Sequence, residues 1–155
     1  MSVHKQWVVL LLPMLLLSGQ GLVYVDGGAS MGASGGTSWG NAFTDFQSTL
    51  DNTASGEIWV AVGTYQPSAY SASCTGCATD RDFTFQLKDS VNLYGGFAGT
   101  EGSFSERDIA MNSTVLSGDI EAVGDASDNV QHYVVLAAFT SPTPTTRLAG
   151  IDNGQ

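Results

Sequence analysis

One segment near the N-terminus has the hydrophobic periodicity of an α-helix. Its apolar residues recur at positions i, i+3, i+4, i+7 and i+11, which lie on one face of a helix. These residues are Trp39, Ala42, Phe43, Phe46 and Leu50. The pattern predicts an amphipathic helix that is capped at its start by the hydroxyl of Thr37 or Ser38 and ends before Gly56.

Short strand-like runs separated by turns account for most of the remaining chain. In residues 57–62, Ile58, Val60 and Val62 alternate with the other side chains, so we expect these three on a buried face. Similar runs occupy residues 22–26, 83–87, 91–94, 114–118 and 132–137. The run centres near residues 60, 92, 115 and 134 are about 20–30 residues apart, a spacing typical of a solenoid of parallel coils.

The first 21 residues have the organisation of a secretory signal peptide. An apolar run from Trp7 to Leu17 follows the basic Lys5, and residues 18–21 are mostly small. This run is too short for a membrane-spanning helix, which needs about 20 apolar residues. We therefore predict cleavage after Gly21, a mature chain without a membrane span, and a secreted or cell-surface location.

The composition is that of an acidic globular chain. Of its 155 residues, 43% are hydrophobic, 15 are Asp or Glu and 5 are Lys or Arg, which gives a net charge of −10 at pH 7. Loss of Lys5 with the signal peptide changes this to −11. Such a charge repels nucleic-acid phosphates and anionic lipids, so we expect no nucleic-acid partner.

Several short strings follow one another in an order that is found in a known family. Among them are Tyr24-Val25-Asp26, residues 36–43, residues 57–65, Leu93-Tyr94-Gly95-Gly96-Phe97 and Leu116-Ser117-Gly118-Asp119-Ile120. Together they resemble the beginning of secreted bacterial right-handed parallel β-helix proteins, the pectate-lyase-like surface proteins. The resemblance extends over most of residues 22–136.

The resemblance implies a mainly β fold, with an N-terminal cap helix and the first coils of a right-handed parallel β-helix, a truncated solenoid. It divides the chain into a signal peptide (1–21), a strand with the capping helix (22–56) and the first coils (57–155), with a loop excursion at 66–82. Members of the family continue with further coils. We therefore expect an uncapped end through which the chain could self-associate.

Two functions remain open, because the family is functionally mixed and a fold does not determine function. The first is a non-catalytic secreted or cell-surface module for adhesion or glycan binding, whose partners are extracellular polysaccharides or other surface proteins. The alternative is the N-terminal part of a polysaccharide lyase or glycoside hydrolase with its active site further along the protein. His132 is the single histidine of the mature chain. We assign no catalytic residue in this chain.

Cys74 and Cys77 form a C-x-x-C pair inside the 66–82 excursion. A zinc site needs two more ligands and a thioredoxin-like redox motif needs a βαβ unit, and neither pattern is present. In an exported chain we therefore predict a local disulfide, with a small effect on stability because the loop it closes is short.

An acidic stretch is the candidate for a metal site. It contains Asp119, Glu121, Asp125 and Asp128. Carboxylates in a glycine-containing loop suit Ca²⁺, but the spacing does not match an EF-hand. A solvated acidic turn is the alternative, and it is the one we expect; no other cofactor is predicted.

Four aromatic residues could stack on sugar rings: Trp59, Tyr65, Tyr70 and Tyr94. We select Trp59 and Tyr65 as the candidate sugar-stacking residues, because alternation places Trp59 opposite the buried face of its strand. The alternative, which we favour for Trp59, is that this ring packs beneath the 66–82 excursion.

Overall fold

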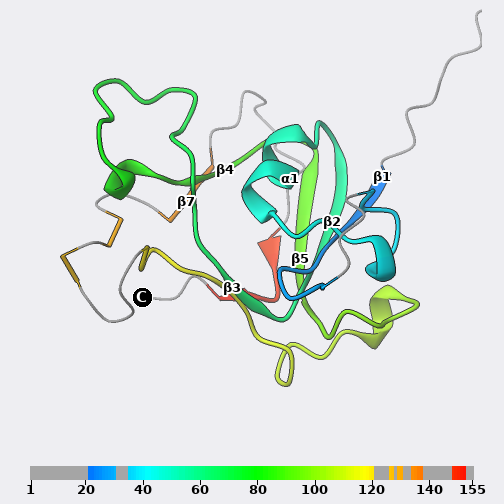
Figure 1. Cartoon of the computed structure of the whole chain (residues 1–155). Helices are drawn as coiled ribbons and strands as arrows, with labels where there is room; N and C mark the ends of the chain where they lie inside the picture. Colours follow the sequence, from blue (N-terminus) through cyan, green and yellow to red (C-terminus); the bar gives the residue numbers. More distant parts are fainter. Residues whose placement is uncertain are drawn as a thin grey trace, which may run out of the picture.

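The computed structural model describes residues 21–30, 35–120, 126–127, 129–130, 134–137 and 148–152. This part of the chain contains three small β-sheets and one short α-helix, α1 (Phe46–Asn52) (Figure 1). The first sheet contains, in spatial order, β1 (Gly21–Val25), β2 (Gly56–Ala61), β5 (Val91–Phe97) and β8 (Leu148–Ala149). The second contains β3 (Gly63–Tyr65), β6 (Thr114–Leu116) and β9 (Ile151–Asp152), and the third contains β4 (Phe85–Leu87) and β7 (Val135–Ala137). The paired strands of all three sheets are parallel.

This arrangement contradicts the predicted β-helix. The four runs whose spacing favoured a solenoid do not stack in one sheet, because β2 pairs with β5, β6 with β3, and β7 with β4. The described strands therefore lie in separate small sheets of four, three and two strands. The connections between strands differ in length, so an even spacing along the chain does not identify the strands that pair.

The register of the first sheet separates two hydrophobic clusters. On one face, Ile58 lies beside Leu93, and both belong to the main core. On the other face, Trp59 lies beside Tyr24 and Tyr94 in a second, aromatic cluster. Because successive side chains of a strand point to opposite faces, the predicted alternation in β2 is confirmed for Ile58 and Trp59.

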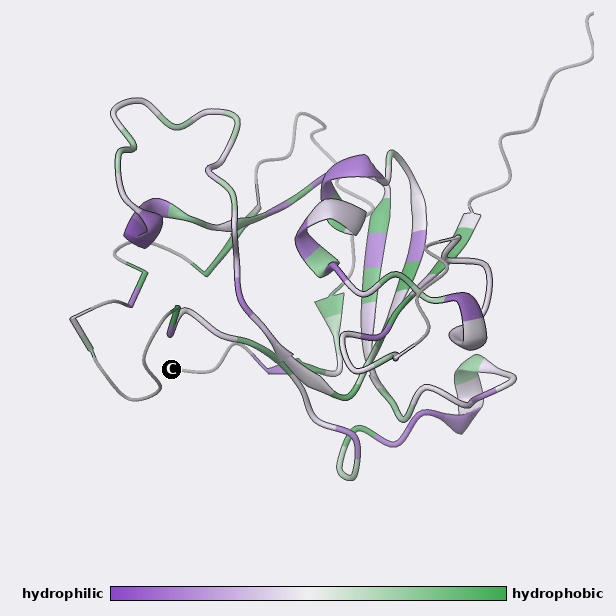
Figure 2. Cartoon of the chain, viewed as in Figure 1, coloured by the Kyte–Doolittle hydropathy of each residue, from purple (hydrophilic) through white to green (hydrophobic). Residues whose placement is uncertain are grey.

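The main core lies between the first sheet, α1 and the strands of the other two sheets. Its largest buried members are Phe46, Leu50, Ile58, Tyr65, Phe85, Leu87, Leu93 and Leu116. Figure 2 shows hydrophobic positions along β2 and β5. Val62 does not extend the buried face as predicted: it is 45% exposed, because β2 ends at Ala61 and the chain turns into β3.

The predicted helix over residues 39–50 is divided into a 3₁₀ turn, an extended segment and α1. The turn spans Trp39–Asn41, and the extended segment follows it. Within that segment, the Phe43 N–H donates to the Tyr24 carbonyl over 2.9 Å, and the Phe43 carbonyl accepts from the Asp26 N–H over 2.8 Å. Phe43 therefore pairs with the outer edge of β1, and this pairing outweighs its helical periodicity.

The start of α1 has a different cap from the one predicted. The carboxylate of Asp45 accepts a hydrogen bond from the Ser48 N–H over 2.8 Å, which satisfies a backbone donor of the first turn. Ser38 makes no side-chain capping bond to the 3₁₀ turn that follows it. Phe46 and Leu50, on the inner side of α1, still pack into the main core as the pattern requires.

The predicted signal peptide lies outside the described residues, apart from Gly21, the first residue of β1. Within the described ranges, no helix combines the length and the apolar character that a membrane crossing requires.

Candidate binding surface on the loop between β3 and β4

The connection between β3 and β4, residues 66–84, is a long loop that projects from the sheets (Figure 1). We call it the β3–β4 loop; it contains the excursion predicted at residues 66–82. Residues 66–79 include no charged side chain, are rich in small residues, and have Tyr70 as their one aromatic residue. Antibody binding loops have a similar character, in which tyrosine supplies contact area and small polar residues adapt to the ligand.

A disulfide and two backbone contacts fix the outer part of this loop. Cys74 and Cys77 form the predicted disulfide, with their Cα atoms 6.0 Å apart. The Ala72 N–H donates to Oε1 of Gln86 in β4 over 2.9 Å. The Thr84 N–H donates to the Ala69 carbonyl, also over 2.9 Å. The loop is therefore tied to β4 through Gln86 and is closed on itself by the bond between Thr84 and Ala69, in addition to the disulfide.

The base of the loop is a 3₁₀ turn, Asp80–Asp82, with its own cap. Oδ2 of Asp82 accepts from the Ala78 N–H over 3.1 Å, and from the N–H and hydroxyl of Thr79 over 3.2 Å each. These bonds satisfy backbone donors where the turn begins. Because both its base and its outer part are fixed, the loop is preorganised, which lowers the entropy cost of binding a ligand.

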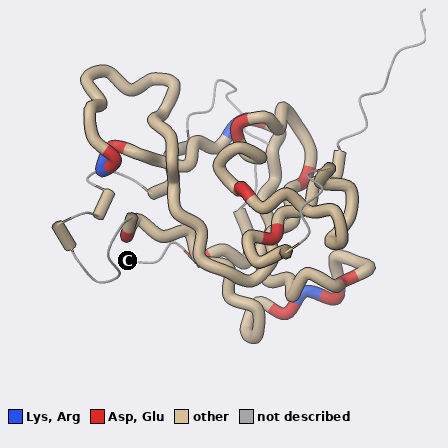
Figure 3. The backbone as a smooth tube through the Cα atoms, in the orientation of Figure 1, with Lys and Arg blue, Asp and Glu red and all other residues tan. Residues whose placement is uncertain are grey.

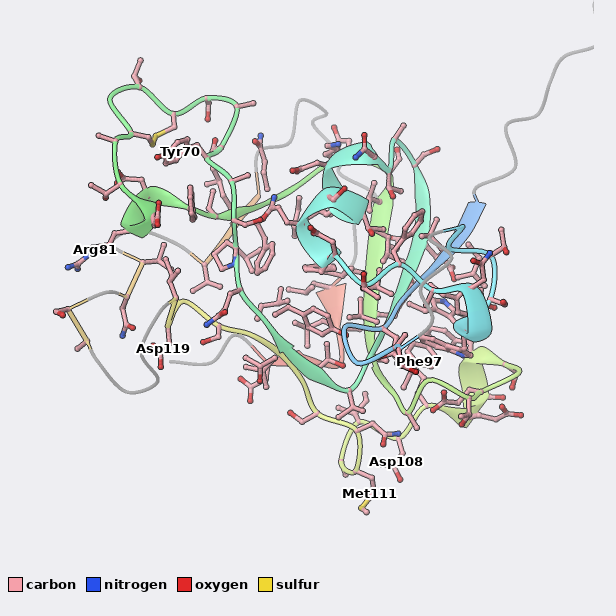
Figure 4. All side chains as sticks on the ribbon, viewed as in Figure 1. Tyr70, Arg81, Phe97, Asp108, Met111 and Asp119 are labelled. Atoms are coloured by element: carbon pink, nitrogen blue, oxygen red, sulfur yellow. A yellow bond between two sulfur atoms is a disulfide. The ribbon has the colours of Figure 1, made fainter. Side chains whose placement is uncertain are left out.

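Tyr70 lies on this loop (Figure 4). It is 44% exposed, and its ring lies against Phe83 with the ring centroids 5.0 Å apart. Phe83 also lines a hollow of about 250 Å³, whose other walls are Ser71, Ser73, Cys74, Asp82, Thr84 and Leu136. An exposed aromatic face thus lies next to a concave surface with hydroxyl groups. Sites of this kind bind small ligands through apolar contact and a few polar groups.

Trp59, one of the two selected sugar-stacking residues, is not available for a ligand. It is 6% exposed, and its ring stacks on Phe97 at a centroid distance of 4.7 Å and an interplanar angle of 12°. Its Nε1–H donates to Oε2 of Glu57 over 3.0 Å. Trp59 also contacts the ring of Phe104, so it packs beneath the segment after β5 and not, as we favoured, beneath the 66–82 excursion.

Tyr65, the other selected residue, lies in the main core and is 7% exposed. Its hydroxyl accepts from the Gly27 N–H over 3.3 Å and donates to the Ala61 carbonyl over 3.1 Å. Burial raises the pKa of this phenol above its usual range, and the nearby Asp26 carboxylate adds to the effect. A stacking role for either selected residue is therefore wrong in this structure.

Tyr70 is one of the four aromatic candidates of the sequence but not one of the two selected. Its surroundings are the signal that distinguishes it. Tyr70 lies among small polar residues beside a C-x-x-C pair, whereas Trp59 lies in the alternating apolar run of residues 57–62. Composition around an aromatic residue therefore indicates exposure better than alternation does.

A second aromatic cluster includes Phe104, in the segment after β5. This segment lies on the other side of the molecule from the β3–β4 loop (Figure 1). There Phe104, 40% exposed, is covered by the guanidinium of Arg107, which lies 4.3 Å from the ring centroid. The same guanidinium donates from Nη1 to the carbonyls of Gly95 in β5 and Ala149 in β8, over 3.3 and 3.4 Å. Because Arg107 is committed to these contacts, we assign this cluster a structural role.

The predicted calcium ligands are only partly described. Asp119 lies after β6, where its N–H donates to the Ser117 hydroxyl over 3.1 Å and its carbonyl accepts from Nε2 of Gln66. Glu121, Asp125 and Asp128 lie outside the described residues. Within the part of the chain that the structure describes, no three His, Cys, Asp or Glu side chains gather around a common point. The calcium prediction therefore stays a prediction.

Comparisons with family models, with curated proteins and with solved structures find no match. The candidate site is therefore defined by the geometry of the β3–β4 loop.

Proposed function

We propose that this protein is a non-catalytic binding module, secreted or located at the cell surface, that binds glycans through the β3–β4 loop. One observation supports this most directly: the exposed Tyr70 ring lies against Phe83, at the edge of a hollow that Ser71 and Ser73 line.

The chemistry of sugars matches this surface. A pyranose ring has apolar C–H faces that stack on aromatic side chains, and a rim of hydroxyl groups that exchange hydrogen bonds with serine and threonine. The Tyr70 ring provides such a face, and its hydroxyl adds a further donor and acceptor. Ser71 and Ser73 line the neighbouring hollow, where their hydroxyls share one hydrogen bond of 2.8 Å and keep further donor and acceptor capacity.

Two features support an extracellular location. Disulfides such as Cys74–Cys77 persist in oxidising compartments and are rare where thiols are kept reduced. In addition, the first 21 residues have the organisation of a signal peptide. Neither feature depends on the identity of the ligand.

The test is a calorimetric titration. The exported product of the full chain is titrated with a panel of neutral oligosaccharides, and the heat of binding is measured. For any oligosaccharide that binds, we expect Tyr70→Ala to weaken affinity by about tenfold or more, because the stacked ring is the central contact. Tyr70→Phe should retain most of the affinity, because the ring remains.

Phe104→Leu is the matched control, because Phe104 is also an exposed aromatic residue but lies in the 3₁₀ turn Phe104–Glu106 after β5 and not on the β3–β4 loop. It should leave the affinity unchanged. A Tyr70→Ala protein with an unchanged unfolding midpoint and an unchanged affinity would show that the β3–β4 loop is not the binding surface.

A further inference from the structure

The β3–β4 loop differs from the rest of this acidic chain in its charge. Figure 3 shows the loop without charged residues along its outer part, and with charges only at its base. The charged residues at the base are Asp80, Arg81 and Asp82. Within the loop, these three side chains are therefore the candidate sources of electrostatic selectivity for the surface around Tyr70, and the net charge of the molecule adds to their effect.

The one cation among them is directed away from the candidate site. The Arg81 side chain extends outward from the base of the loop, away from Tyr70 (Figure 4). Its guanidinium donates to the backbone carbonyl of Ser127. Asp82, by contrast, lines the hollow, and the neighbouring Asp80 is exposed. Among the described residues that line the hollow, Asp82 is the one charged side chain, and none carries a guanidinium or ammonium group.

Recognition of carboxylates and sulfates in proteins depends on Arg and Lys, which form charge-assisted and often bidentate hydrogen bonds. From these charges we infer that the hollow beside Tyr70 binds uncharged pyranosides and discriminates against uronates and sulfated sugars. This inference rests on the proposed function, since it names the ligand class of the same site. The net charge of −11 expected for the mature chain acts in the same direction.

The experiment compares ligands that differ only in charge. Each neutral gluco-, galacto- or manno-oligosaccharide that binds the exported full chain is paired with the same oligosaccharide oxidised at C6 to the carboxylate. At low ionic strength the neutral form should bind about tenfold more tightly, because the carboxylate approaches Asp82 and Asp80. The ratio should fall as salt is raised to about 0.15 M, because these groups are near the surface and are screened.

Two variants assign the discrimination to the loop. Asp80→Asn should reduce the ratio between neutral and oxidised ligand, and Asp80→Asn/Asp82→Asn should reduce it further. Asp152→Asn, which removes an exposed carboxylate from β9 in another sheet, is the matched control and should leave the ratio unchanged. Because Asp82 also caps the turn at the base of the loop, the single Asp80 variant and the salt dependence test the inference without disturbing that cap.

The possible failures are distinguishable. Equal or tighter binding of the oxidised ligand, lost in Tyr70→Ala, overturns the charge selectivity and leaves glycan binding intact. Failure of every oligosaccharide to bind, or binding that Tyr70→Ala does not change, overturns the proposed function and this inference with it.

Discussion

At the scale of single residues, Tyr65 and Tyr70 have different roles because one side chain is buried and the other is exposed. The Tyr65 hydroxyl is buried but satisfied, because the Gly27 N–H donates to it and the Ala61 carbonyl accepts from it. A buried hydroxyl is tolerated only with such partners. Tyr70 is 44% exposed, and its ring lies against Phe83, which lines a hollow, so its phenol can meet a ligand.

The raised pKa of Tyr65 predicts a pH dependence of stability. Burial disfavours the phenolate, so the folded protein keeps this proton at a pH where the unfolded chain, with a pKa of about 10, has lost it. The contribution of Tyr65 to stability is therefore complete below pH 10 and decreases as the pH rises toward the folded pKa. Tyr65→Phe should cost about 1 kcal/mol at neutral pH through its lost hydrogen bonds.

Urea denaturation at a series of pH values from about 7 to 11 measures this effect. The difference in unfolding free energy between the wild type and Tyr65→Phe should become smaller above about pH 10, because the variant has no phenol at this site. The other tyrosines are common to both proteins and cancel in the difference. A difference that stays constant over the whole range would contradict the assignment.

At the scale of elements, the sequence predicts where strands occur better than it predicts how they pair. The runs at 22–26, 57–62 and 91–94 correspond to β1, β2 and β5, because apolar alternation reports burial directly. Pairing depends on contacts between strands tens of residues apart, which a spacing pattern does not contain. The same limit explains Phe43, whose periodicity is helical but whose backbone pairs with β1.

The sequence predicts only part of the candidate site, because the site also depends on contacts between segments that are far apart in the chain. The Cys74–Cys77 disulfide follows from the two cysteines and their separation, and the structure confirms it. The choice of Trp59 over Tyr70 failed because the rings that cover Trp59 belong to β1, to the end of β5 and to the segment after it. Such a cover depends on the tertiary fold, which the local pattern does not reveal.

The cap of α1 gives a direct test at this scale. Asp45→Ala should lower the free energy of unfolding by about 1 kcal/mol, because the Ser48 N–H loses its acceptor. Ser38→Ala is the matched control, because Ser38 makes no side-chain capping bond, and it should change stability by less than about 0.5 kcal/mol. Urea denaturation of the two variants distinguishes them. The reverse order would show that the helix begins at Ser38, as its periodicity indicates.

At the scale of the whole molecule, binding and stability depend on separate regions. The main core is formed by α1 and strands of all three sheets, with Val25, Ile58 and Phe85 among its fully buried side chains. The β3–β4 loop lies outside these sheets and is closed by its own disulfide. Changes to Tyr70 or Asp80 should therefore affect binding without a large change in global unfolding.

The start of β1 bears on the last prediction, which concerns export. Cleavage after Gly21 leaves Leu22 as the first residue and retains the pairing of residues 22–25 with β2. On its other edge, β1 is fixed by the Tyr24 N–H, which donates to the Gly36 carbonyl over 2.9 Å, and by Phe43. The mature protein therefore keeps β1 bound on both sides.

The sequence obtained by N-terminal sequencing of the product exported from a bacterial host should begin within about two residues of Leu22. Leu11→Arg interrupts the apolar run and should keep the chain inside the cell, whereas Gln6→Arg adds a charge to the basic region and should not. Recovery of the intact N-terminus, starting at Met1, in a membrane fraction would show that the segment is an anchor and is not cleaved.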